Sequence, residues 1–142
     1  MSAVHSQGFA FNRTRQAYLA TRLRVAATHW LRLRGLMGAN AATFCAGEGL
    51  WIVPSHGVHT LAMRFPIDVV YLDSDKIVVY ARPNLKPWRV APVNMKAASV
   101  LELPNHTLDS TGTAVGDRLE IELGEFELGK MEPGKLLEVR RA

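Results

Sequence analysis

Two histidines and a methionine stand close together in the sequence, in types and a spacing that could bind a soft metal ion. His56 and His59 are three residues apart, and Met63 follows four residues later. Imidazole and thioether groups are ligands for copper and similar ions. Residues of odd separation on a strand face opposite ways, so the histidines converge only if Gly57 interrupts the strand. A further ligand is not evident, so we assign no metal and no other cofactor, and Met63 is expected in the apolar core.

Two acidic residues interrupt apolar stretches and are the candidates for acid–base chemistry. Asp68 stands within IDVVYL, and Glu102 stands within SVLEL. A carboxylate buried alone is unfavourable, so Asp68 is either a structural acceptor for backbone amides or an arginine, or an acid or base in a cleft. Glu102 poses the same question and can also face solvent. Arg34 and Arg64 are the natural ion partners of these two carboxylates.

Trp88 and its surroundings complete a candidate polar site. Flanked by Pro87 and Arg89, the indole of Trp88 is either an exposed stacking platform for a sugar or base, or a lid on the edge of the fold. Polar residues that interrupt apolar β segments reduce stability unless function or pairing compensates. We therefore hypothesise one ligand-binding cleft. Its residues are His59, Thr60, Met63, Arg64, Asp68, Trp88 and Glu102.

The basic residues are concentrated in the first third of the chain. No Asp or Glu occurs before Glu48, and the whole chain carries a net charge of +4. The arginines of this stretch either form a polyanion-binding face or pair with acidic residues of C-terminal strands. Pairing is favoured, and nucleic acid is not expected as a partner, because phosphate-cradling and RNA-stacking motifs are absent. These arginines are Arg13, Arg15, Arg22, Arg24, Arg32 and Arg34.

Length and composition indicate a single globular domain over residues 1–142. The chain is 48% hydrophobic and 21% charged, which is typical of a folded protein and not of a disordered one. Its one cysteine, Cys45, excludes an intramolecular disulfide. No segment approaches the roughly 20 apolar residues that span a bilayer. The N-terminus lacks the pattern of a secretory signal, so we expect a cytoplasmic protein.

Short alternating or β-branched segments predict most of the strands. Ala17–Ala26 alternates as a half-buried strand does, with Leu19, Thr21, Leu23 and Val25 on one face. Ile67–Leu72 and Ile77–Ala81 are joined by a tight turn, and this is the clearest hairpin in the chain. Further strands are expected at Leu50–Val53, His59–Met63, Ser99–Leu103 and Arg118–Leu123, with a weak hairpin of Phe126–Leu128 and Leu136–Val139.

The remaining segments predict one short helix and one long loop. Thr28 can cap a helix that carries Trp30, Leu33 and Met37. Three prolines make 82–95 a loop-rich passage that cannot be a central strand. The expected fold is therefore mainly β: a β-sandwich of jelly-roll type or a partly open barrel, with one short helix.

Six ordered motifs stand out in the middle of the chain. They are Arg32–Gly38 (RLRGLMG), Gly47–Ile52 (GEGLWI), His59–Asp73 (HTLAMRFPIDVVYLD), Pro87–Arg89 (PWR), Ser99–Leu103 (SVLEL) and Val115–Arg118 (VGDR). In this order and spacing they resemble the bacterial and archaeal family called domain of unknown function 192. The resemblance covers about Ala17 to Leu123 and leaves 124–142 as a C-terminal extension. It implies a compact, mainly β fold and no activity, because none is established for the family. Departures are Ala39, where the family often has a basic residue, and Asp75-Lys76, where it often has Asp-Gly.

Three classes of function remain open. The leading hypothesis is a non-catalytic binding or accessory module that takes a small polar ligand or a protein partner in the polar cleft. The second is a hydrolase-like enzyme in which Asp68 or Glu102 acts as a base with His59 on a small polar or carbohydrate-like substrate. No catalytic residue is assigned, because the sequence has no nucleophile motif. The third is polyanion binding through the N-terminal arginines.

Overall fold

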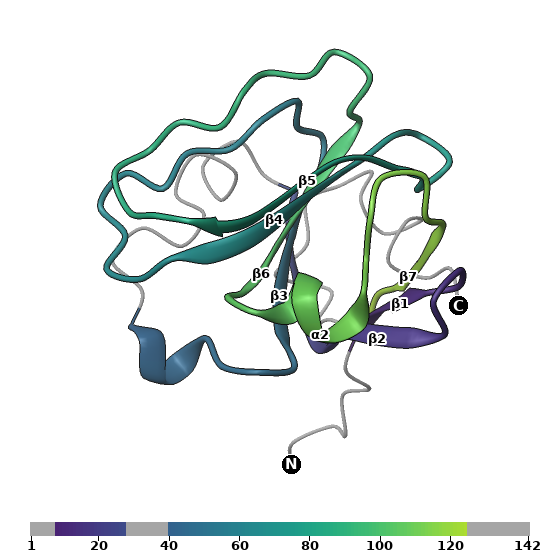
Figure 1. Cartoon of the computed structure of the whole chain (residues 1–142), viewed down its shortest axis with the longest axis horizontal. Helices are drawn as coiled ribbons and strands as arrows, with labels where there is room; N and C mark the ends of the chain where they lie inside the picture. The colour runs from purple at the N-terminus through teal and green to yellow at the C-terminus, as the bar shows by residue number, and fades with distance from the viewer. Residues whose placement is uncertain (1–7, 28–39, 125–142) are drawn as a thin grey trace, which may run out of the picture.

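One mixed sheet of seven strands organises the protein. The computed structural model describes residues 8–27 and 40–124, whose sheet has the strand order β5-β4-β6-β3-β2-β1-β7 and curls into a half-barrel (Figure 1). All neighbouring strands are antiparallel except β2 and β3. The strands are β1 (Gly8–Asn12), β2 (Ala17–Ala26), β3 (Glu48–Ile52), β4 (Ile67–Leu72), β5 (Val78–Leu85), β6 (Ser99–Pro104) and β7 (Leu119–Glu122).

The expectation of a mainly β fold with a short helix is confirmed, in the form of a partly open barrel. The curl brings the two ends of the sheet together, because Ile77, just before β5, forms an isolated bridge with Arg118, just before β7. In the described part of the chain, two short helical segments accompany the sheet: the 3₁₀-helix η1 (Ala41–Thr43) and the α-helix α2 (Thr107–Thr111). No helix within residues 8–27 and 40–124 is long and apolar enough to cross a membrane.

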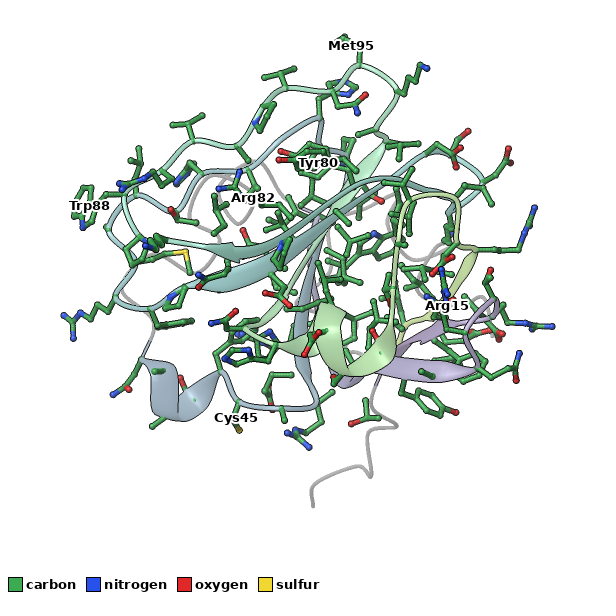
Figure 2. All side chains as sticks on the ribbon, viewed as in Figure 1. Arg15, Cys45, Tyr80, Arg82, Trp88 and Met95 are labelled. Carbon is green, nitrogen blue, oxygen red and sulfur yellow. The ribbon has the colours of Figure 1, made fainter. Side chains whose placement is uncertain are left out.

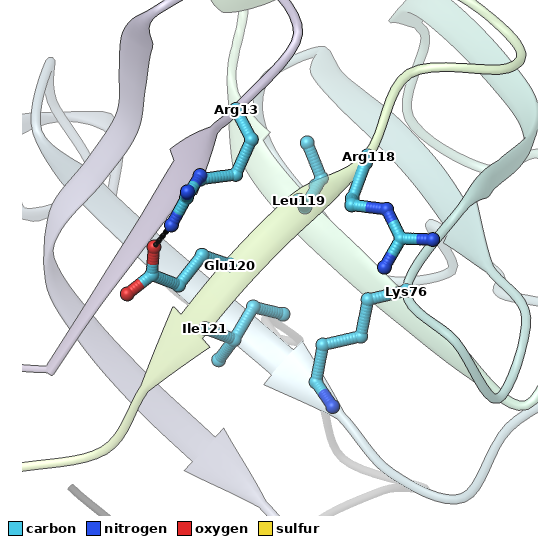
Figure 3. A pocket seen from close by; sticks show the side chains of 6 residues that line it. All are labelled: Arg13, Lys76, Arg118, Leu119, Glu120 and Ile121. Carbon is cyan, nitrogen blue, oxygen red and sulfur yellow. Dashed lines mark hydrogen bonds and ion pairs between the residues drawn. The ribbon is translucent and has the colours of Figure 1, made fainter.

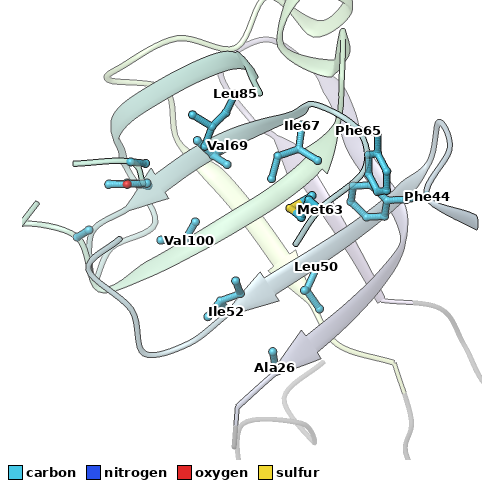
Figure 4. Packing of buried hydrophobic residues seen from close by; sticks show 13 residues of the cluster. Ala26, Phe44, Leu50, Ile52, Met63, Phe65, Ile67, Val69, Leu85 and Val100 are labelled. Carbon is cyan, nitrogen blue, oxygen red and sulfur yellow. The ribbon is translucent and has the colours of Figure 1, made fainter. Parts of the chain in front are cut away.

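The two faces of the sheet carry separate apolar clusters, because successive strand residues point to opposite sides. The inner cluster lies within the curl, joins both ends of the sheet, and includes Val70, Leu101 and Leu108 of α2. The outer cluster lies on the other face and includes Val69, Met63 and Phe65 (Figure 4). Met63 and Phe65 come from the connection between β3 and β4, so loops cover this face where a sandwich would have a second sheet.

The predicted strands match the structure best where the apolar pattern is local. β2 begins and ends as expected, and β4 and β5 form the expected hairpin. In β2 the alternation is broken, since Ala20 is buried and Thr21 is exposed. The cause is a register shift in the β1–β2 pairing.

Several elements differ from the expectations. β1 and α2 were not expected, and His59–Met63 is not a strand, since only His59 forms a bridge, with Val90. β5 runs on through Pro83 into the expected loop, which is allowed because β5 is an edge strand. The expected helix after Thr28 and the expected C-terminal hairpin lie outside the described residues.

Candidate functional site

Two loops that are far apart in the sequence pair along one margin of the molecule. We call residues 55–65 and 86–98 the paired loops. Between them, the Thr60 amide donates to the Arg89 carbonyl (2.8 Å), and the Ala91 amide donates to the Val58 carbonyl (2.9 Å). The Asn94 amide donates to the His56 carbonyl (2.8 Å) in the same direction of pairing. The paired loops are therefore an irregular two-stranded ribbon and not two independent loops.

Thr60 is the anchor of this ribbon. Its side chain is fully buried, and its Oγ1 donates to the Lys86 carbonyl (2.6 Å) and accepts from the Arg89 amide (2.8 Å). Its backbone carbonyl accepts from the Trp88 amide (2.9 Å). One threonine thus fixes the backbone on both sides of Trp88, so its role in the structure is positioning.

Trp88 is held out from the surface in a strained conformation. Its side chain is 63% exposed, and its φ of 63° lies in the left-handed region that bulky residues rarely adopt. Such strain has a free-energy cost of about 1–3 kcal/mol and persists only where the surroundings impose it. The Thr60 bonds supply that constraint, and Figure 2 shows Trp88 at the outer edge of the molecule.

Other large apolar side chains are exposed on the same paired loops. Val90, Val93 and Met95 are each at least 70% exposed. Trp88 and Met95 mark two points on one margin of the molecule in Figure 2. Of the exposed apolar residues, only Trp88 was predicted from the sequence, although a Pro-rich passage that still carries Val90, Val93 and Met95 was a signal for the others. The exposed apolar residues of the paired loops are Leu61, Trp88, Val90, Val93 and Met95.

All charged residues of the paired loops are basic. No Asp or Glu occurs between Gly49 and Ile67 or between Lys76 and Leu101. The exposed basic side chains of the paired loops are Arg64, Lys86, Arg89 and Lys96. This margin therefore combines apolar side chains with positive charge.

The residues considered for a metal site have other roles. The His56 Nδ1 bonds to the Ala97 carbonyl (2.7 Å), and the His59 Nδ1 accepts from the Leu61 amide (3.2 Å). Met63 is buried in the outer cluster, as expected for a core residue. Among residues 8–27 and 40–124, no group of three His, Cys, Asp or Glu side chains is placed to hold a metal ion.

Asp68 is a fully buried acceptor of two backbone amides. Its Oδ1 accepts from the Asn84 amide of β5 (2.9 Å), and its Oδ2 accepts from the Leu108 amide of α2 (2.8 Å). Asn84 has a φ of 52°, so the carboxylate holds an unusual backbone turn as well as the helix. Of the two roles considered for Asp68 from the sequence, these contacts fit that of a structural acceptor for backbone amides.

Glu102 is buried in the outer face of the sheet. It is 1% exposed, lies directly between Leu50 and Val69 in register, and its Oε2 has no hydrogen-bond partner among the described residues. Burial raises the pKa of Glu102 to about 8, and Arg24, one strand beyond Leu50 in the same row, lowers it only in part. The side chain therefore stays largely protonated at neutral pH.

The seven predicted site residues do not share one cleft. The structure brings His59, Thr60 and Trp88 together on the paired loops, which also carry Arg64. Asp68 and Glu102 face opposite sides of the sheet, since Asp68 is paired in register with Leu103 and Glu102 with Val69. Met63 belongs to the core. The candidate functional site is therefore the exposed surface of the paired loops.

The N-terminal arginines that the structure describes mostly pair with acidic residues. Arg13 pairs with Glu120 (2.7 Å) and Arg15 with Asp117 (2.9 Å). Arg22 pairs with Glu48. Arg32 and Arg34 lie outside the described residues. The pairing that the sequence analysis favoured is thus present for three of these arginines, two of them with residues close to or within β7.

A groove of about 410 Å³ lies beside β7, away from the paired loops (Figure 3). Arg13, Glu120, Lys76 and Arg118 supply its charged side chains. Arg13 is engaged by Glu120, and the Lys76 ammonium lies 5.8 Å from the centre of the Trp51 ring. The groove contains none of the seven predicted site residues.

Comparisons with known proteins agree on family and fold. A UPF0127 protein of Thermococcus sibiricus is 29% identical over 119 residues, which cover 80% of this chain and 75% of that protein. A protein of unknown function from Novosphingobium aromaticivorans has a similar structure, with a TM-score of 0.66 at 20% identity, over 80% of this chain and 82% of that one. A protein from Sinorhizobium meliloti also has a similar structure, with a TM-score of 0.67 at 22% identity, over 85% of this chain and 96% of that one. At such identities the two structures establish the fold alone.

The family model known as DUF192, described as "Uncharacterized ACR", matches residues 10–121. The match includes the six motifs noted in the sequence and both paired loops. This chain belongs to the DUF192 family.

Proposed function

We propose that this protein is a non-catalytic binding module whose contact surface is the paired loops. The observation that carries the proposal is the geometry of Trp88: a large aromatic side chain, 63% exposed, in a strained backbone conformation that buried Thr60 imposes. A rigidly presented aromatic side chain is a frequent anchor of binding surfaces, because it offers a large contact area with little loss of conformational entropy.

The roles of the other candidate residues support binding over catalysis. Both carboxylate oxygens of Asp68 are occupied by backbone amides, and the Thr60 hydroxyl is occupied by backbone groups on both sides of Trp88. Glu102 lies within the outer face of the sheet and is 1% exposed. A general base must reach the proton that it abstracts. Asp68 and Thr60 are engaged by the backbone, and Glu102 is enclosed within the sheet, where a substrate does not reach it.

Binding assays with matched variants test this proposal. The probes are a poly-glutamate peptide, a single-stranded oligonucleotide, a neutral oligosaccharide and phospholipid vesicles. We expect at least one probe to bind the parent protein and to bind Trp88→Ala at least about tenfold more weakly, as for an anchor residue. Val115→Ala is the control, since Val115 is equally exposed at 63% but lies outside the paired loops. The proposal is wrong if Trp88→Ala binds every probe as the parent does.

A further inference from the structure

The paired loops have the composition of a surface that contacts a membrane interface. Their exposed apolar side chains include a tryptophan, and their exposed charged side chains are all basic. Tryptophan is favoured at the level of lipid headgroups, and lysine and arginine are attracted to anionic lipids. An acidic protein partner would explain the charge, but exposed side chains spread along an outer margin suit a flat and deformable surface better than a shaped pocket.

The arrangement of the side chains supports a peripheral contact. Trp88 and Met95 lie at two points of the same margin, and the loop between them carries Val90 and Val93 (Figure 2). Along this loop the exposed basic residues Lys86, Arg89 and Lys96 alternate with the exposed apolar ones, so a surface that approaches the loop would meet both kinds. Apolar side chains could then enter the headgroup region while the basic ones remain at the level of the phosphates.

The ribbon is also held firmly enough to present these side chains without unfolding. The Tyr71 hydroxyl, from the C-terminal end of β4, donates to the Pro92 carbonyl (2.7 Å), and the Ser55 amide donates to the Ala98 carbonyl (3.0 Å). The Thr60 bonds fix the opposite end at Trp88. A surface ordered before contact loses less entropy when it binds.

We infer that the paired loops bind the surface of membranes that contain anionic phospholipids, with Trp88, Val90, Val93 and Met95 entering the headgroup region. This inference rests on the proposed function, because it names the partner of the same surface. It concerns a reversible peripheral contact in which apolar and electrostatic contributions act together.

Sedimentation with vesicles tests the inference. One vesicle preparation contains phosphatidylcholine alone, and the other contains phosphatidylcholine and phosphatidylglycerol in equal parts. We expect binding to the mixed vesicles only, with strong weakening as the ionic strength rises from about 0.01 M to about 1 M. Removal of one basic residue, as in Lys86→Gln, should weaken binding about fivefold. Arg118→Gln is the matched control, because it removes the same charge beside β7.

Variants of the apolar residues separate insertion from simple charge attraction. Val93→Ser combined with Met95→Ser should weaken vesicle binding about tenfold or more, whereas the control Val115→Ser should not. Lipids that carry bromine in the acyl chain should quench the tryptophan fluorescence of the parent, and Trp88→Phe should lose most of this quenching. Equal binding to both vesicle types, or unchanged binding of the double variant, would overturn the inference.

The outcomes also separate this inference from the proposed function. If vesicles do not bind, but poly-glutamate binds in a way that depends on Trp88, the membrane inference is wrong and the binding surface stands. If no probe binds in a way that depends on Trp88, both proposals are wrong.

Discussion

The carboxyl group of Glu102 is buried on the outer face of the sheet, next to Leu50 and Val69. Burial raises its pKa from 4.5 to about 8. Between these two values the native protein binds more protons than the unfolded chain, so the free energy of unfolding must fall as the pH rises through this window. The contribution of this group to stability is therefore fully present below pH 4.5 and is lost as the pH rises toward about 8.

Glu102→Gln keeps the shape of the side chain and removes this titration. For the parent, we expect the free energy of unfolding to fall by on the order of 3 kcal/mol between pH 5 and pH 8 through this group. In Glu102→Gln that decline should be absent, and the variant should be the more stable protein at pH 8. Urea denaturation at a series of pH values measures both. A parent and variant with parallel pH profiles would show that Glu102 is ionised in the native state.

Asp68 accepts hydrogen bonds from a backbone amide of β5 and one of α2, and its replacement is expected to destabilise the fold without changing the binding surface. In Asp68→Asn one side-chain acceptor becomes a donor and faces a backbone amide. We expect a loss of about 2–4 kcal/mol, which is typical when a buried hydrogen bond to a charged group is removed. Asp75→Asn, at an exposed position in the β4–β5 turn, is the control and should be nearly neutral. Thermal or urea unfolding decides; a neutral Asp68→Asn would contradict the structural role of the carboxylate.

At the scale of elements, sequence patterns predicted where strands lie better than they predicted which distant segments pair with each other. β2, β4 and β6 could be predicted because alternation and β-branched residues act over a few neighbouring positions. α2 was not predicted, since five residues are too short for helical periodicity to show. The pairing of the two loops was also out of reach, because it depends on hydrogen bonds between residues about thirty positions apart.

The same limit explains why the candidate site was predicted only in part. Thr60 and Trp88 were both selected as unusual polar or aromatic residues, but nothing local indicates that one positions the other. Asp68 and Glu102 were placed in the same cleft because both interrupt apolar strands. The register between β4 and β6 puts them on opposite faces, and that register cannot be read from either strand alone.

Thr60→Val tests the role of Thr60 as the anchor of the paired loops. Valine keeps the volume but leaves the Lys86 carbonyl and the Arg89 amide without their side-chain partner. We expect a loss of about 2 kcal/mol in global stability. Amide hydrogen exchange should be faster at Trp88 and Arg89 than in the parent.

Thr60→Ser retains the hydroxyl and serves as the conservative control. It should restore slow exchange at Trp88 and Arg89. Unchanged exchange in Thr60→Val would mean that the backbone bonds alone hold the paired loops, and that Thr60 is not their anchor.

At the scale of the whole molecule, hydrogen bonds to Asp117 join the β1–β2 hairpin to the segment that precedes β7. The side-chain amide of Asn12 (2.9 Å) and the guanidinium of Arg15 (2.9 Å) both donate to Oδ2 of Asp117. The backbone amide of Ala114 donates to the same oxygen (3.0 Å). Burial by itself raises the pKa of Asp117, but hydrogen bonds from Arg15, Asn12 and Ala114 outweigh it and lower the pKa. The sequence predicted that N-terminal arginines would meet C-terminal acids, and charge balance alone was sufficient for that.

Asp117→Asn should therefore destabilise the fold in a pH-dependent way. A carboxylate with a lowered native pKa contributes stability above its unfolded value of 3.8, and this contribution is lost as the pH falls through the native value. We expect Asp117→Asn to be less stable than the parent by about 1–3 kcal/mol at pH 7, with the difference shrinking in acid. Chemical denaturation at pH 7 and at pH 3 provides the comparison, and a difference that is the same at both values would contradict the assignment.

The most direct test of the central claim is the free energy of unfolding of Trp88→Asn. In the proposed function, Trp88 serves contact with a partner and not the packing of the fold. Asparagine tolerates the left-handed conformation, so the variant should unfold within about 1 kcal/mol of the parent in urea while binding is lost. A loss of about 3–5 kcal/mol, as for a tryptophan removed from a core, would instead identify Trp88 as a lid on the fold and contradict the account.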